Sequence, residues 1–306
     1  MEKKRVSMRQ IAKECGCSLA AVSYALNRSG QGKISSATRL RIIETAKKLN
    51  YSPEQSPRKR TGRAAILVMA GPGDGAGRRA HLMDLACRLT EQLRKLSIAA
   101  VIMEIDDLVE RWKQVRSLAP DILYILDGGH KAIDYVDPPC VQPVVFVDSD
   151  NKHDLYYKIL PNYPALRELA ARRLGEEHPF LMTETVRSAE LLTLMTDGLP
   201  TLDVFVNDGS QDMAAFLAAH RNRKGIVVGD LLAVEACRYI PPENLAVISA
   251  LEQPGLFPKG LTVFSVPNRI RAERAAQTGR DLLNLNYDHG ASNRILLDAE
   301  SAVTHR

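Results

Sequence analysis

The 306-residue sequence predicts an α/β fold, in which a small all-α unit at the N-terminus precedes a body of doubly wound parallel sheets. Residues 7–49 carry helix caps, a central glycine and apolar residues at helical spacing. From residue 64 onward, short apolar runs alternate with helical patterns, the order typical of parallel sheets covered by helices. The net charge changes sign between the same two parts, since residues 1–63 carry +11 and the rest of the chain carries −6.

The first helix is predicted to begin after Ser7. Ser7 and Gln10 have the spacing of a capping box, in which the serine accepts the third helical N–H and the glutamine reaches back. The helix buries Ile11 and Ala12. Gly16 follows, where a tight turn between helices requires a positive φ that glycine adopts without steric cost.

The second helix is predicted over 19–26, with Ser18 as its cap and Val22 on its inner face. Ala12 of the first helix, Gly16 of the turn and Val22 follow one another at offsets of four and six residues. Two closely crossing helices need this order. Ser35 is placed to cap a third helix over 37–49. Together these signals predict a helix-turn-helix unit.

The basic N-terminal unit indicates a nucleic-acid contact. Fifteen Lys and Arg residues stand against four Glu residues within residues 1–63, and Asp is absent there. A cluster of positive charge on one unit of a mildly acidic chain is typical of proteins that bind phosphate backbones.

Residues 6–53 resemble the DNA-binding headpiece of the lactose/galactose-repressor (LacI/GalR) family almost continuously, with a longer loop over 28–33. The residues that carry the resemblance are Val6-Ser7-Met8, Ile11-Ala12, Gly16-Cys17-Ser18, Val22-Ser23, Leu26-Asn27, Ile34-Ser35, Thr38-Arg39 and Leu49-Asn50-Tyr51-Ser52-Pro53. The resemblance implies a dimeric transcriptional regulator, most simply a repressor, that binds a double-stranded DNA operator.

The helix over 19–26 would then lie in the major groove. The residues at the matching positions, which we expect to contact DNA, are Met8, Arg9, Ser18, Leu19, Ala20, Ser23, Tyr24, Asn27, Ser35, Thr38 and Arg60. Leu19 and Ala20 offer only apolar contact to thymine methyl groups, whereas Tyr24 adds a hydroxyl. Inward packing of Tyr24 is the alternative.

The family follows its tyrosine-x-proline sequence with a short hinge helix, whose leucine enters the minor groove. Counting from Tyr51, Pro57 stands at the position of the family's alanine and Arg60 at that of the leucine. Proline is tolerated only in the first turn of a helix, so a hinge helix would begin at or just before Pro57. We expect Arg60 to enter a narrow A·T minor groove. A basic tether that touches phosphates without preference is the alternative.

The body alternates candidate strands with helical patterns. The strands are expected at 64–70, 98–103, 122–126, 144–147, 180–182, 204–206, 226–228, 246–249 and 261–266. The helices are expected near 79–96, 107–117, 163–174, 186–195, 210–220, 231–239 and 268–284.

Segments 225–249 and 261–267 are similar to the same family's strand–Asn-Asp–helix passage and to its crossover between subdomains. The implied body has two periplasmic-binding-protein-like lobes with a ligand between them, and it is shortened most clearly within 176–207. The expected divisions are a headpiece (1–54), a basic hinge (55–63), and an effector-binding and dimerisation domain (64–306) with an N-lobe of about 64–161 plus 267–290 and a C-lobe of about 162–266 plus 291–306.

Two residues are implied to hold a small-molecule effector. Arg187 stands where the family has the arginine of R-x-x-G-F, although Glu190 replaces the glycine, and Asp230 stands on the aspartate of Asn-Asp. A guanidinium facing a carboxylate suits a sugar or another polar metabolite. Surface charges or a helix-cap aspartate are the alternatives. Aromatic residues make up only 5% of the chain, which indicates an altered sugar site.

The glycine-rich segment 71–77 lies between a strand and a helix, as a phosphate-cradling turn does. It lacks both G-K-[ST] and the GxGxxG spacing, so a surface loop is the favoured interpretation. Catalytic signatures are absent and the seven histidines are dispersed, so we expect no enzymatic activity, no cofactor and no metal. The alternative function is a cytoplasmic sugar- or nucleotide-binding protein without a DNA role, which the basic N-terminus argues against.

The N-terminus lacks the apolar segment of a secretory signal, and no apolar run reaches the roughly 18 residues of a membrane helix. The five cysteines are scattered, and Cys15-Gly16-Cys17 lacks the second ligand pair of a structural zinc site. We therefore expect a cytoplasmic protein with no membrane partner, and the resemblance implies a homodimer.

Overall fold

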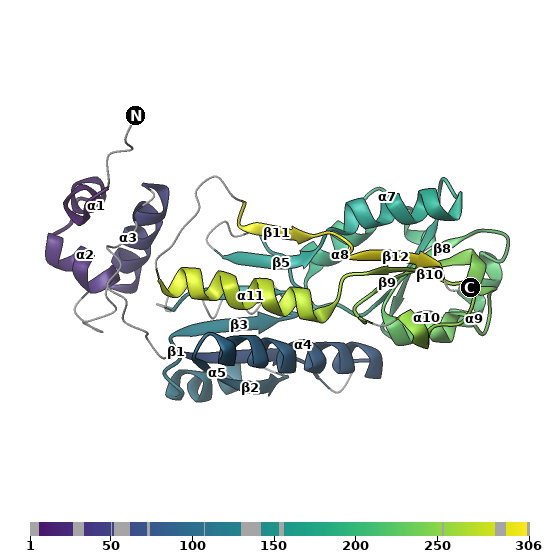
Figure 1. The fold of residues 1–306 in the computed structure, drawn as a ribbon, viewed down its shortest axis with the longest axis horizontal. Helices are drawn as coiled ribbons and strands as arrows, with labels where there is room; N and C mark the ends of the chain where they lie inside the picture. Colours follow the sequence, from purple (N-terminus) through teal and green to yellow (C-terminus); the bar gives the residue numbers. More distant parts are fainter. Residues whose placement is uncertain are drawn as a thin grey trace.

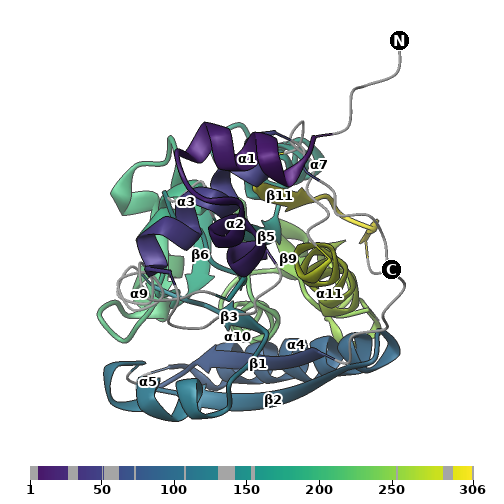
Figure 2. The same cartoon turned by 90° about the vertical axis from the view of Figure 1, so that its left-hand side faces the viewer.

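The computed structural model describes residues 6–26, 34–49, 51, 62–71, 74–106, 108–129, 142–152, 156–252, 254–284 and 292–304. Within these ranges the chain forms a helical headpiece and two lobes, each built on a six-stranded sheet (Figure 1). The headpiece lies beside the N-lobe at one end of the long axis, and Figure 2 views the molecule from that end. The predicted fold class is confirmed.

The headpiece contains α1 (Met8–Cys15), α2 (Leu19–Leu26) and α3 (Ser36–Lys48). Ser7 caps α1 by accepting the Gln10 N–H at 3.3 Å, and Gly16 has the left-handed φ of 59° that the turn requires. The three helices enclose a small apolar core, whose most buried members are Ile11, Val22, Ala25, Leu26, Ile42 and Ala46.

The N-lobe is a parallel sheet in the order β11-β5-β4-β3-β1-β2. Its strands are β1 (Gly62–Met69), β2 (Ile98–Ile105), β3 (Ile122–Leu126), β4 (Val144–Val147), β5 (Tyr157–Pro161) and β11 (Arg294–Leu297). Its helices are α4 (Ala76–Lys95), α5 (Leu108–Ser117) and α11 (Asn268–Leu283). Helices α4 and α11 pack against each other and bury the larger apolar core of this lobe.

The C-lobe has the strand order β12-β10-β9-β8-β6-β7, in which only β12 runs antiparallel to its neighbour. Its strands are β6 (Phe180–Glu184), β7 (Val204–Asn207), β8 (Gly225–Val228), β9 (Leu245–Ser249), β10 (Thr262–Ser265) and β12 (Ser301–Thr304). Its helices are α7 (Tyr163–Leu174), α8 (Ala189–Thr196), α9 (Met213–Ala219) and α10 (Asp230–Ala236), with short 3-10 turns at Thr201–Asp203, Pro242–Asn244 and Pro254–Leu256.

The chain passes between the lobes after β5, after β10 and after β11. The expected division is wrong in two respects, and the first is that it gave all of 291–306 to the C-lobe. Strand β11 instead pairs with β5 in the N-lobe sheet, and β12 alone joins the C-lobe. Strand β11 alternates exposed and half-buried residues at a sheet edge, so its sequence carries little apolar signal. The expected hinge also ends too late, since Gly62 and Arg63 already pair with β2.

In the part of the chain that the structure describes, no helix combines the length and the apolar character of a membrane span.

Candidate functional site

The first turn of α2 is presented on the surface of the headpiece. The Ser18 hydroxyl accepts the Ala21 N–H at 3.1 Å and so caps the helix. Leu19 is 45% exposed, and Ala20 is exposed beside it, while Val22 on the opposite face is fully buried. The helix is thus anchored by one face and offers its N-terminal residues to a partner.

The other predicted DNA contacts occupy different settings. Arg9 is exposed, whereas Met8 is half-buried and packs against the headpiece core. Ser23 and Tyr24 are half-buried as well, so the structure places the Tyr24 ring neither fully inward nor fully outward.

At the start of α3, Ser35 accepts the Thr38 N–H at 3.1 Å, and the two hydroxyls lie 2.8 Å apart. Asn27, Pro57 and Arg60 lie outside the described residues.

A second site lies where the lobes meet. Asp127 and Asp148 directly follow the adjacent strands β3 and β4, so both lie at the carboxyl edge of the N-lobe sheet. Both side chains are buried, and both residues have positive φ, 55° and 50°. Left-handed backbone in residues other than glycine costs about 1 kcal/mol or more and gathers at functional sites. Sequence reasoning missed both, although an aspartate after each of two apolar runs was a usable signal.

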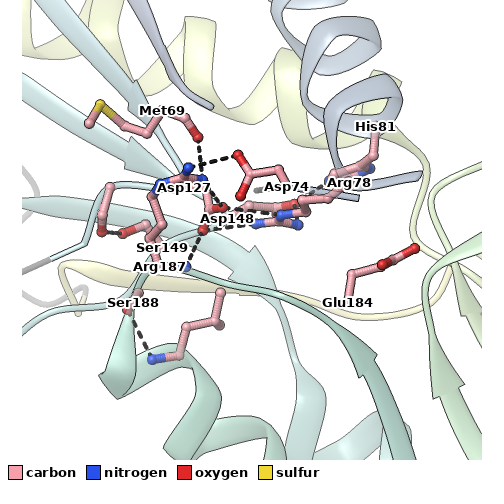
Figure 3. Close-up of polar contacts among 12 residues, drawn as sticks. Met69, Asp74, Arg78, His81, Asp127, Asp148, Ser149, Glu184, Arg187 and Ser188 are labelled. Atoms are coloured by element: carbon pink, nitrogen blue, oxygen red, sulfur yellow. Dashed lines mark hydrogen bonds and ion pairs between the residues drawn. The ribbon is translucent and has the colours of Figure 1, made fainter. Parts of the chain in front are cut away.

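Two arginines and a histidine contact these aspartates, and Figure 3 labels Arg78 and His81 beside the two carboxylates. Arg78 of α4 donates from Nε to Asp127 Oδ2 at 3.2 Å, and Arg271 of α11 donates from Nη1 to Asp148 Oδ2 at 2.6 Å. His81 Nε2 lies 2.5 Å from the same Asp148 oxygen.

The pKa values of this group follow from burial and charge. Burial would raise the pKa of Asp148, but Arg271, His81 and Arg78 outweigh burial and hold it below its usual range. Burial lowers the pKa of His81, so the imidazole is neutral near pH 7 and donates from Nε2. Burial raises the pKa of Asp127, an effect that Arg78 and Arg187 partly offset.

Arg187, predicted to bind an effector, reaches across from the C-lobe into the N-lobe. It follows β6, and its guanidinium donates to the Met69 carbonyl at 2.8 Å and to Asp74 Oδ2 at 2.7 Å. Its backbone N–H donates to Asp127 Oδ1 at 3.0 Å. The residue therefore joins two strand-end loops of the opposite lobe.

Asp230, the other predicted effector residue, makes a different contact. It opens α10, and its Oδ2 accepts the Ala250 N–H at 3.4 Å within the C-lobe. Among the contacts of the described residues, Arg187 pairs with N-lobe carboxylates rather than with Asp230. The structure does not bring the two predicted effector residues together as a pair.

Glu184, at the end of β6, faces the start of α4. A Cβ atom on Gly77 would lie 2.5 Å from Glu184 Oε1, so the glycine allows this close approach. The carboxylate accepts the Asn207 side-chain amide at 2.9 Å, and burial raises its pKa. An acidic group at this helix start opposes phosphate, which argues against the phosphate-cradling interpretation of segment 71–77.

These features define a helix-turn-helix protein whose basic headpiece precedes a two-lobed α/β body with a charged group between the lobes. The family model described as "Bacterial regulatory proteins, lacI family" matches residues 7–54. The headpiece is therefore a DNA-binding domain of the lacI family, which confirms the resemblance drawn from the sequence.

Solved structures share the fold of the whole chain. The lac repressor dimer bound to operator and an anti-inducer is 16% identical, with a TM-score of 0.60 over 98% of both chains. The complex of the transcriptional regulator CelR with cellobiose has a TM-score of 0.61 at 16% identity, also over 98% of both chains. The transcription regulator CcpA of Lactococcus lactis has a TM-score of 0.61 at 16% identity, covering 81% of this chain and 100% of its own. No curated protein matches by sequence.

Proposed function

We propose that the protein is a dimeric transcriptional repressor that binds a double-stranded DNA operator and whose affinity is modulated by a small molecule held between its lobes. The observation that carries this proposal is the lacI-family headpiece, whose α2 is anchored by Val22 and exposes Leu19 and Ala20. A capped helix with a free N-terminal turn is suited to the major groove.

The contacts with DNA divide by chemistry. Leu19 and Ala20 approach base edges, and Tyr24 and Ser23 follow them along the same helix. The residues proposed to fix the register on the phosphates or to complete the interface are Met8, Arg9, Ser18, Asn27, Ser35 and Thr38. Arg60 is proposed to enter the minor groove between the half-sites.

An apolar stripe on the body supports a homodimer. Met83 of α4 and Leu231 and Val234 of α10 are between 36% and 55% exposed. Helices α4 and α10 contact each other (Figure 1). Exposed apolar residues on neighbouring helices are typical of a protein interface. A second copy of the chain is the occupant that a two-fold operator requires.

The effector is proposed to be a sugar or another polar metabolite that contacts Arg187 and Asp230. Support comes from the position of Arg187 where the lobes meet, from the place of Asp230 at the start of α10, and from the CelR structure, which holds cellobiose. The protein acts where the operator is, so we place it in the cytoplasm.

A gel-shift titration tests the DNA-binding function. The full chain should retard duplex DNA, and the affinity should fall steeply with salt, since log K drops by about 0.9 for each phosphate neutralised. Absence of a shift at low salt, or a shift that salt leaves unchanged, would contradict the proposed function.

A further inference from the structure

The segment Arg187–Ser188 holds the C-lobe to three separate loops of the N-lobe, which follow β1, β3 and β4. Besides the three bonds of Arg187, the Ser188 hydroxyl donates to the Asp150 carbonyl at 2.7 Å, and the Asp150 N–H donates to that hydroxyl at 3.2 Å. Asp150 follows β4, whereas Asp127 follows β3. Two neighbouring residues of one lobe therefore bind the ends of adjacent strands of the other.

The N-lobe loops are shaped for this segment. A Cβ atom on Gly129 would lie 2.8 Å from the Arg187 carbonyl oxygen, and one on Gly71 would lie 3.2 Å from Arg187 Nη2. Any larger residue at 129 would force the backbones apart. Glycine at these two positions therefore allows the two lobes to lie this close together.

The charges around Arg187 balance only when the lobes meet. The Asp74 and Asp127 side chains are 5% and 0% exposed, and Arg187 lies against both carboxylates. Among the ion pairs of the described residues, Arg78 binds Asp127, and the cation that binds Asp74 is Arg187. Separation of the lobes would remove the cation that faces Asp74, and a buried carboxylate without its cation is costly.

We propose that Arg187 is an interlobe latch, which joins the lobes through the chain's own groups and sets the operator affinity. This inference rests on the proposed function and deepens it, since it concerns regulation at the same site. With the latch formed, the two N-lobes of a dimer hold one arrangement, so both headpieces meet their half-sites without a further ordering cost. When the latch is broken, the two N-lobes must be ordered as the operator binds, and this cost lowers the operator affinity.

Hydrogen–deuterium exchange of the full chain without DNA tests the latch. The substitution is Arg187→Ala, and the reporter is the Asp150 amide, which bonds across the lobes at a distance from the altered side chain. We expect its exchange to become about tenfold faster, while the amides of β3 stay protected, because opening is local rather than global. Asp74→Asn is the second variant and should act in the same direction.

The matched control is Arg223→Ala. Arg223 also binds a carboxylate and a carbonyl, Asp203 Oδ2 at 3.0 Å and the His178 oxygen, but within the C-lobe alone. This control should leave the Asp150 amide unchanged. Equal exchange of that amide in wild type, Arg187→Ala and Asp74→Asn would overturn the latch, as would faster exchange throughout β3.

Operator affinity is measured separately on the same proteins. Arg187→Ala should weaken binding about tenfold relative to Arg223→Ala, the size of a typical coupling between sites. Faster exchange with unchanged affinity would overturn the regulatory part of the inference. A wild-type chain that binds no duplex would instead overturn the proposed function, while the exchange result still decides whether the latch exists.

Discussion

Single residues explain why charge can be buried between the lobes. Asp127 and Asp148 occupy left-handed backbone, which aspartate tolerates better than most residues. This conformation follows the last strand residue and turns each carboxylate toward α4, where Arg78 and His81 lie. Each aspartate therefore lies at the end of its strand and also binds a side chain of α4.

Glu184 makes the stability of the protein depend on pH. Burial raises its pKa in the folded chain above the ordinary value of about 4.3. Ionised Glu184 therefore lowers stability at neutral pH, and this penalty disappears as the pH falls through the raised pKa. Glu184→Gln should raise the Tm at pH 7.5 by about 2 °C and change it little at pH 4.5.

Thermal unfolding at the two pH values measures this effect. Glu177→Gln, which alters an exposed acid between α7 and β6, is the control and should change neither Tm. An equal gain for Glu184→Gln at both pH values would show that the charge is not responsible.

Among the elements, the turn between α1 and α2 depends on one glycine. Gly16 has a φ of 59°, so Gly16→Ala should cost the headpiece about 1 kcal/mol and weaken DNA binding. Gly175, with a φ of 64° at the end of α7, is a matched site in the C-lobe. Gly175→Ala should cost similar stability without affecting DNA binding. Equal loss of DNA affinity in both variants would contradict a specific role for the headpiece turn.

Helix α2 should recognise thymine through its methyl group. The exposed Leu19 and Ala20 have no hydrogen-bonding side chain, so their contact with thymine is the burial of its methyl group, worth about 0.8 kcal/mol. Replacement of a contacted thymine by uracil in a half-site should therefore weaken binding by about fourfold. Fluorescence anisotropy with matched duplexes measures the difference. Equal affinity for the two duplexes would mean that other side chains select the sequence.

Elements with strong local signals could be predicted, and tertiary pairings could not. Helix α7 matches its predicted bounds because Asn162 caps its start and Gly175 ends it in left-handed conformation. Strands β5, β11 and β12 were missed. The site was half predicted: the family motif located Arg187, but its partners Asp74 and Asp127 are 113 and 60 residues away in the chain. Such distant pairings depend on strand order, which local pattern does not encode.

At the scale of the whole molecule, the apolar stripe should form the dimer. Met83→Glu or Leu231→Glu would place a charge in a desolvated interface, so each should yield monomers at micromolar concentration. Leu169→Glu alters a comparably exposed leucine, 45% accessible, on α7 away from the stripe and should leave dimers intact. Light scattering after gel filtration measures the mass. Dimeric Met83→Glu and Leu231→Glu proteins would place the interface elsewhere.

The central claim is that a pair of these headpieces recognises a specific DNA sequence. Selection from a randomised duplex pool by the full chain, followed by sequencing of the bound DNA, tests it most directly. We predict enrichment of an inverted repeat whose half-site centres lie about 10 bp apart, one helical turn, as two-fold related recognition helices require. A bound pool with the composition of the starting pool, or an enriched site without two-fold symmetry, would contradict the account.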